Sequence, residues 1–232
     1  MWSTEIIFAL VFVVAFLVAL PIYLTAERKS SDGQREFNKA AALKLTVSGI
    51  CALCALLGFF LWGMHRESTL ILIPIALLCS VVGDYFLQFI ALDERKFKIG
   101  IFFFALTQVF LCIFLILQHG ISWPEFAIAV GVVVGTWLMI TLLKWELGGA
   151  KYPLLAYTGI LIFVASKAVL ALLASVSIPL SVSLMAAGMG LFVISDSLLG
   201  IRYYSGAKKS KSLIYLITYF FAILFIALSS LF

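Results

Sequence analysis

The sequence contains few charged residues for its length. Asp, Glu, Lys and Arg together make up 12% of its 232 residues, against about 25% in a typical soluble domain. This scarcity of charge excludes an ordinary soluble fold. The same sequence is 64% hydrophobic, with a mean hydropathy of +1.19. Such a composition predicts an integral membrane protein.

Side chains that commonly bind metals are also few, with four cysteines and two histidines. Cys51 and Cys54 form a C-x-x-C pair inside an apolar run, but no second pair or nearby histidine completes a zinc site. His65 and His119 fall in predicted loops. We therefore interpret the cysteines as packing residues and predict neither a metal nor an organic cofactor.

The first apolar segment lacks the features of a cleaved signal peptide. It has no basic residues ahead of its apolar core, it carries Glu5, and it shows no small-x-small cleavage site. We therefore predict a retained first helix.

Long apolar runs occupy most of the chain. A helix that spans a bilayer needs roughly 20 apolar residues. The runs of about this length cover residues 4–24, 40–62, 69–91, 97–118, 125–143, 152–174, 178–201 and 212–231. Little sequence remains between them. We therefore predict one all-α integral membrane domain over residues 1–232, a bundle of about eight transmembrane helices.

The basic residues gather in alternate connections between the predicted helices. Of the 16 Lys and Arg residues, only Lys44, Arg66 and Lys167 lie elsewhere. The positive-inside rule places these connections in the cytoplasm and both termini outside it. A basic face toward anionic lipid explains the net charge of +5, and no pattern typical of nucleic-acid binding is present. Short loops without a sorting signal favour a bacterial inner (plasma) membrane.

Several polar residues are predicted to lie at membrane depth, where a charge costs about 2.5–3.5 kcal/mol on insertion scales and usually marks function. A helix rise of about 1.5 Å per residue places four of them about 7–13 Å from the cytoplasmic ends of their helices. These four are Lys44, Asp84, Tyr157 and Asp196. Gln108 is placed nearer the midplane. Lys167 is placed near the outer surface, where its long side chain is expected to reach the lipid headgroups.

Asp84 and Asp196 permit three interpretations. Buried ion pairs, such as Asp84 with Lys44, would join helices without chemistry. The carboxylates could instead line the proton or cation pathway of a transporter. In the third interpretation they form a catalytic dyad, because two acids in a low dielectric repel as anions and one stays protonated near neutral pH. One protonated and one ionised carboxyl provide a general acid and a base. The residues alone favour catalysis only slightly over transport.

The order of the polar landmarks resembles a known family. The landmarks are Lys44, Gly83-Asp84, Gly100 and Phe104, Tyr157, and "FVISDSLL" from Phe192 to Leu199. In this order they are similar to the YhhN-like lysoplasmalogenases, which are eight-helix membrane proteins. The sequence departs from the family at two positions. Leu45 stands where the family usually has proline, and Gln108 stands where it usually has histidine. Glutamine can hydrogen-bond but does not transfer a proton at neutral pH.

The resemblance implies a membrane-embedded hydrolase that cleaves the vinyl ether bond of lysoplasmalogens and releases a fatty aldehyde and a glycerophospho-alcohol. Asp84 and Asp196 are implied as the catalytic pair. One would protonate a vinyl carbon, and the other would stabilise the oxocarbenium ion and activate water, much as paired carboxylates act in glycosidases. Their assignment stays open. The residues implied to bind substrate or to orient water are Lys44, Gln108, Tyr157 and Ser195.

The expected partners are a lysophospholipid (lysoplasmalogen) substrate and the lipid bilayer. Two alternative functions remain beside the hydrolase. One is a proton-coupled transporter, and the other is a non-catalytic lipid-binding membrane protein, which the replacement at Gln108 favours. The headgroup and the chain length of the substrate are not predicted.

Overall fold

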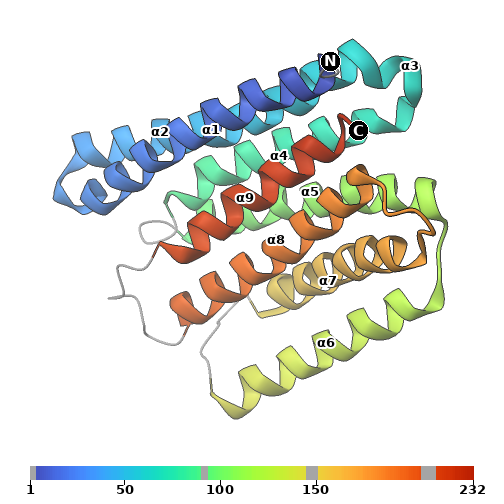
Figure 1. The fold of residues 1–232 in the computed structure, drawn as a ribbon. Helices are drawn as coiled ribbons and strands as arrows, with labels where there is room; N and C mark the ends of the chain where they lie inside the picture. Colours follow the sequence, from blue (N-terminus) through green and yellow to red (C-terminus); the bar gives the residue numbers. More distant parts are fainter. Residues whose placement is uncertain (1–3, 90–93, 145–150, 205–212) are drawn as a thin grey trace.

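The computed structural model describes residues 4–89, 94–144, 151–204 and 213–232, and these residues form helices joined by short connections, without a strand (Figure 1). The long helices are α1 (Thr4–Lys29), α2 (Gln34–Gly58), α4 (Leu72–Leu87), α5 (Glu94–His119), α6 (Trp123–Leu142), α7 (Lys151–Ala174), α8 (Leu180–Tyr204) and α9 (Ile214–Ser229). The shorter elements are η1 (Ser30–Asp32), the π-helical turn η2 (Phe59–Gly63), α3 (Met64–Arg66) and the 3₁₀ turn η3 (Ser68–Ile71).

The predicted all-α membrane fold is confirmed. In the described part of the chain, seven helical segments are long and apolar enough to cross a bilayer, and α9 is a shorter apolar helix of 16 residues. Two predicted boundaries differ from the structure by five residues or more. α1 continues to Lys29 rather than ending at 24, and α2 begins at Gln34 rather than at 40. An apolar run marks only the part of a helix that lies in hydrocarbon, so polar turns at its ends were missed.

α9 lies at the centre of the bundle. It packs against α8 and also contacts α1, α2 and α4. Phe220, Ile223 and Ile226 on α9 are all fully buried, as expected for a helix that is apolar on every side. α8 approaches it closely at Gly188, where a Cβ atom would lie 2.9 Å from the carbonyl oxygen of Ala222. Small residues allow such close helix contacts in membranes.

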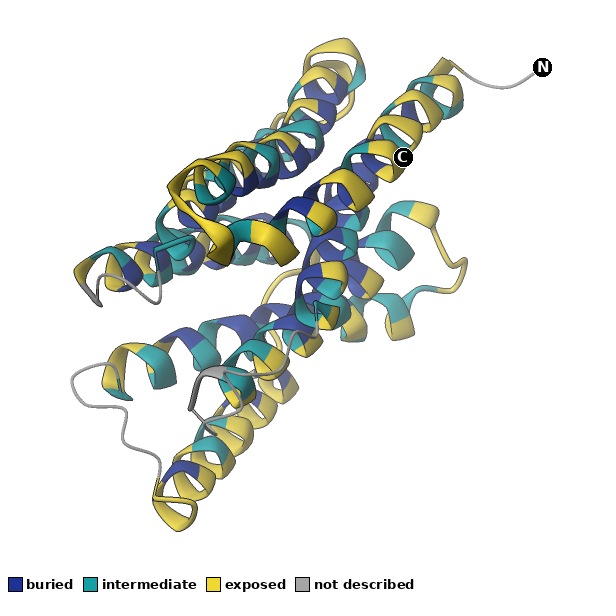
Figure 2. Cartoon of the chain, turned by 90° about the vertical axis from the view of Figure 1, so that its left-hand side faces the viewer, coloured by how far each residue is buried: buried dark blue, intermediate teal, exposed yellow. Residues whose placement is uncertain are grey.

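α6 lies at the edge of the bundle and packs mainly on α7 (Figure 1). Only Glu125, Ala129 and Ile140 are buried on this helix. Figure 2 shows the general pattern, in which buried residues occur where helices face one another and exposed residues cover the outer faces. The exposed residues of α6 are mostly apolar, which suits contact with lipid.

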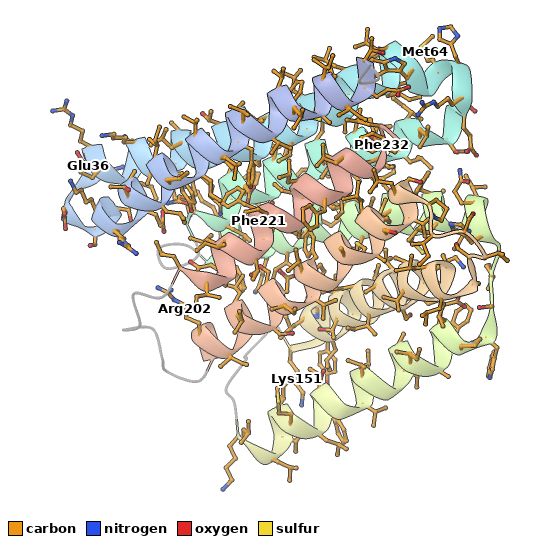
Figure 3. The ribbon with its side chains drawn as sticks, viewed as in Figure 1. Glu36, Met64, Lys151, Arg202, Phe221 and Phe232 are labelled. Atoms are coloured by element: carbon orange, nitrogen blue, oxygen red, sulfur yellow. The ribbon has the colours of Figure 1, made fainter. Side chains whose placement is uncertain are left out.

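Arg66 brings the two ends of the chain together. Its guanidinium donates hydrogen bonds to Glu5 Oε1 and to the carbonyl oxygen of Leu231, both at 2.6 Å. The start of α1 and the segment after α9 therefore lie at the same end of the bundle. Glu36 and Arg202 lie at the opposite end, on the left of Figure 3. We call this opposite end, which holds the connection from α1 to α2, the basic end. Its cytoplasmic orientation stays a prediction from the Lys and Arg distribution.

The expectation that Lys167 reaches the lipid headgroups is wrong. Lys167 is 1% exposed, and its Nζ lies 3.2 Å from Glu125 Oε1 on α6. Glu125 belongs to a capping box at the start of α6, in which its Oε2 accepts a hydrogen bond from the backbone N–H of Ser122 at 3.0 Å. The carboxylate is thus held next to α7, where it can neutralise the lysine. The position of Lys167 along its helix predicted headgroup contact. That position does not show that α6, which carries Glu125, lies alongside α7.

Removal of one partner of the Glu125–Lys167 pair should destabilise the fold. In Lys167→Met, the buried Glu125 carboxylate loses its cation, which costs about 3–5 kcal/mol. The double variant Glu125→Gln/Lys167→Met should recover most of this loss, because no unpaired charge remains. The measurement is the free energy of unfolding in detergent, with Lys29→Met as an exposed control. An unaffected single variant, or a double variant less stable than the single one, would contradict the prediction.

Candidate functional site

A cavity of about 430 Å³ lies in the half of the bundle toward the basic end. Each long helix contributes at least one side chain to its wall. The polar and charged residues of the wall are Tyr23, Glu27, Lys44, Asp84, Gln88, Thr136, Tyr157, Thr158, Ser195, Asp196, Ser197, Tyr215 and Tyr219. The rest of the wall is mainly apolar, including side chains from α5, α6 and α7. The cavity therefore suits a molecule with a long apolar part and a compact polar part.

One charged group in the wall consists of Lys44, Asp84 and Tyr219. Lys44 Nζ on α2 lies 3.3 Å from Asp84 Oδ1 on α4 and 3.4 Å from the Asp84 carbonyl oxygen. The Tyr219 hydroxyl on α9 donates to Asp84 Oδ2 at 2.8 Å. Both carboxylate oxygens thus have a partner, and Asp84 is 1% exposed. The adjacent cation compensates the charge of this carboxylate.

A second acidic group consists of Asp196 and Tyr157. The Tyr157 hydroxyl on α7 donates a hydrogen bond to Asp196 Oδ2 on α8. No lysine or arginine among the described residues lies within ion-pair distance of Asp196. Asp196 is only partly buried, and it lines the cavity. Compared with Asp84, it is more accessible to a bound molecule and less compensated in charge.

The two carboxylates therefore differ in their surroundings. Both line the cavity, but no direct contact joins them in the described part of the chain. Asp84 is bonded to a lysine and a tyrosine, and Asp196 only to a tyrosine. Unlike environments of this kind let two carboxyl groups hold different protonation states.

The glycine and phenylalanine of the sequence landmarks fit together sterically. A Cβ atom on Gly83 would lie 2.8 Å from the Phe104 ring, so the ring can occupy its position only because residue 83 has no side chain. Phe104 also meets Phe192 and Tyr219 edge to face, with ring centroids 6.1 and 5.7 Å away. This aromatic packing holds the helix segment that carries Asp84 against α5 and α9.

Ser195 has a different contact from the expected one with substrate or water. Its hydroxyl donates to the carbonyl oxygen of Tyr215 at 2.9 Å, and the residue is 2% exposed. The serine therefore joins α8 to α9. It lines the cavity next to Asp196, and its hydrogen bond fixes the part of α8 that positions this carboxyl group.

Gln108 lies one helical turn beyond Phe104 on α5 and is 0% exposed. Its side chain lies near the Tyr157 hydroxyl, yet neither Oε1 nor Nε2 has a hydrogen-bond partner within the described residues. A buried polar group without a partner costs about 1–3 kcal/mol. Unlike Lys44, Asp84, Tyr157, Ser195 and Asp196, Gln108 does not line the cavity.

Sequence reasoning missed several polar residues of the cavity wall, among them Tyr219, Tyr23 and Glu27. Tyr219 could have been found, because Tyr215 and Tyr219 are four residues apart in an apolar run and therefore share one helix face. Tyr23 and Glu27 have the same spacing on α1. Glu27 was missed because it lies beyond the apolar run that ends at residue 24.

The described residues contain no group of three or more His, Cys, Asp or Glu side chains that could hold a metal ion. Cys51 and Cys54 are fully buried and unbridged in the core. Both histidines are exposed. The polar chemistry of the cavity thus rests on carboxyl, hydroxyl, amide and ammonium groups.

Comparison with known proteins agrees with the order of these landmarks. A family model described as the YhhN family matches residues 43–230. No match was found to a curated protein or to a solved structure. The matched region spans α4 to α9 and about two thirds of α2, and it includes Asp84 and Asp196. The chain belongs to the YhhN family of membrane proteins.

Proposed function

We propose that the protein is a membrane-embedded hydrolase that cleaves the vinyl ether bond of lysoplasmalogens, releasing a fatty aldehyde and a glycerophospho-alcohol. The observation that carries this proposal is the pair of unlike carboxyl groups, Asp84 and Asp196, in the wall of one largely apolar cavity. Family membership agrees with it. A single-chain lipid fits the division of the wall into an apolar part and a polar part.

Asp196 is the proton donor in this proposal. Vinyl ether hydrolysis begins when a proton is added to the vinyl carbon that does not bear the oxygen, which requires a strong, positioned acid. Asp196 has no cationic partner among the described residues and it lines the cavity, so it can hold a proton where a substrate can receive it. Tyr157 fixes the orientation of the carboxyl group through its hydrogen bond to Oδ2.

Asp84 stabilises the cation that results. Protonation converts the vinyl ether into an oxocarbenium ion, and a fixed negative charge nearby lowers the energy of this ion. Lys44 compensates the charge of Asp84, and the hydrogen bond from Tyr219 fixes the position of its carboxylate. Because both of its oxygens are already bonded, Asp84 acts through its charge and Asp196 handles the protons.

Water completes the reaction at the carbon that bears the ether oxygen. It adds to the oxocarbenium ion and returns its proton to Asp196, which restores the acid and leaves a hemiacetal. The hemiacetal then separates into the aldehyde and the alcohol, as its hydroxyl proton moves to the departing oxygen. Gln108 does not line the cavity, so its unpartnered amide, beside Tyr157, acts on this water through the Tyr157 hydroxyl. These reaction steps together consume one vinyl ether and one water and need no further reactant.

The Asp196→Asn variant should lose activity and stay folded. Its amide cannot protonate carbon, and removal of a general acid lowers kcat by about 10²- to 10⁴-fold. The amide oxygen can still accept the Tyr157 hydrogen bond, so the fold should persist. The measurement is fatty aldehyde release by the purified protein from a lysoplasmalogen, with folding checked by the thermal midpoint in detergent.

Two controls make this test specific. Asp32→Asn makes the same chemical change at an exposed position outside the cavity and should keep full activity. The matching ester lysophospholipid should not be cleaved, because ester hydrolysis begins with attack at a carbonyl and offers no vinyl carbon to protonate. No aldehyde from the unaltered protein across lipid and pH conditions would overturn the proposal in favour of transport or lipid binding.

Replacement of Gln108 should separate activity from stability. Gln108→Leu removes two buried, unpartnered polar atoms, so stability should be unchanged or higher. Activity should fall, by up to about 100-fold, because the attacking water loses its orientation. Gln108→His, which can still hydrogen-bond, should retain more activity than Gln108→Leu. Equal activity of Gln108→Leu and the unaltered protein would exclude a role for the amide in orienting water.

A further inference from the structure

A second group of polar residues lies in the cavity wall nearer the basic end. It consists of Glu27 and Tyr23 on α1, Gln88 directly after α4, and Tyr215 on α9. Gln88 Nε2 donates a hydrogen bond to Glu27 Oε2 at 3.3 Å. The proposed reaction uses none of these four residues. All of them line the cavity, so its wall here offers a ligand a carboxylate and two phenol side chains.

This group lies one helical turn from the catalytic carboxylates. Gln88 follows Asp84 by four residues on α4, and Tyr215 precedes Tyr219 by four residues on α9. Four residues correspond to about 6 Å along a helix. The helix directions place Glu27, Gln88 and Tyr215 toward the basic end, while Asp84 and Tyr219 lie deeper. A lipid whose vinyl ether reaches Asp196 would therefore extend its polar end toward Glu27.

The charge around Glu27 favours a cationic ligand. Within the described residues, no lysine or arginine lies at ion-pair distance from this carboxylate, although the basic end carries many of both. Two cations lie close to residues of the cavity wall: Arg202 lies over the Tyr215 ring, 5.1 Å from its centroid, and Lys44 is paired with Asp84. Aromatic faces and a carboxylate together bind ammonium groups well, including quaternary ones.

We propose that Glu27, with Tyr23 and Tyr215, binds the positively charged amine of the substrate headgroup. The subsite would make the cavity prefer amine headgroups, such as ethanolamine or choline, over headgroups that lack a cation. This inference rests on the proposed function for the placement of the lipid. Glu27 and Tyr23 on α1 lie outside residues 43–230, the part that matches the family, whereas Tyr215 lies inside it.

The test measures equilibrium binding, which does not depend on catalysis. The probes are saturated ether lysophospholipids, which cannot be hydrolysed at a vinyl ether, with the same alkyl chain and either a choline or a glycerol headgroup. The unaltered protein should bind the choline probe about tenfold more tightly. Glu27→Gln keeps the size of the side chain and an oxygen that can accept the Gln88 hydrogen bond, but removes the charge. It should lose this preference and leave the affinity for the glycerol probe unchanged.

The outcomes distinguish the subsite from the reaction. Glu36→Gln, the same change at the start of α2 and outside the cavity wall, should keep the preference for choline. Equal affinity of the unaltered protein for both probes would overturn the subsite, as would an equal loss for both probes in Glu27→Gln. A preference for choline that Glu27→Gln abolishes, in a protein that releases no aldehyde, would support the subsite and refute the hydrolase.

Discussion

The ion pair between Lys44 and Asp84 is the contact on which the basic half of the bundle depends. A charge at this depth in a membrane is costly unless it has a partner, and here α2 supplies the cation and α4 the anion. Tyr219 brings the central helix α9 to the same carboxylate. Three helices are thus joined at one polar point, and the cavity opens beside it.

The bundle contains a second buried ion pair with a different consequence. Glu125 and Lys167 satisfy each other between α6 and α7 and do not line the cavity. Lys44 and Asp84 also satisfy each other, but Asp196 lies in the same cavity wall with no cationic partner in the described part of the chain. The chemical difference between the two regions therefore arises from an unpaired acid beside a paired one. Without Asp196, the Lys44–Asp84 pair would be a structural contact like the Glu125–Lys167 pair.

Composition and apolar periodicity predicted the membrane fold and the helix order, because the bilayer imposes length and apolarity on each span. Depth along the helices also placed Lys44, Asp84, Tyr157 and Asp196 in one layer, where the cavity lies. Depth does not determine which helices are neighbours. For this reason the partner of Lys167 was missed, and so was the position of Glu27, which lies past the end of its apolar run. The catalytic roles of Asp84 and Asp196 stay proposals.

The most direct measurement of the central claim follows the proton to carbon. Lysoplasmalogen is hydrolysed by the purified protein in D₂O, the aldehyde is reduced at once to block exchange, and the product is analysed by mass spectrometry. Protonation of the vinyl ether by Asp196, whose proton exchanges with solvent, predicts one deuterium on the carbon next to the former carbonyl. Aldehyde released without deuterium at that carbon would contradict the account, because the bond would then have been broken by another route.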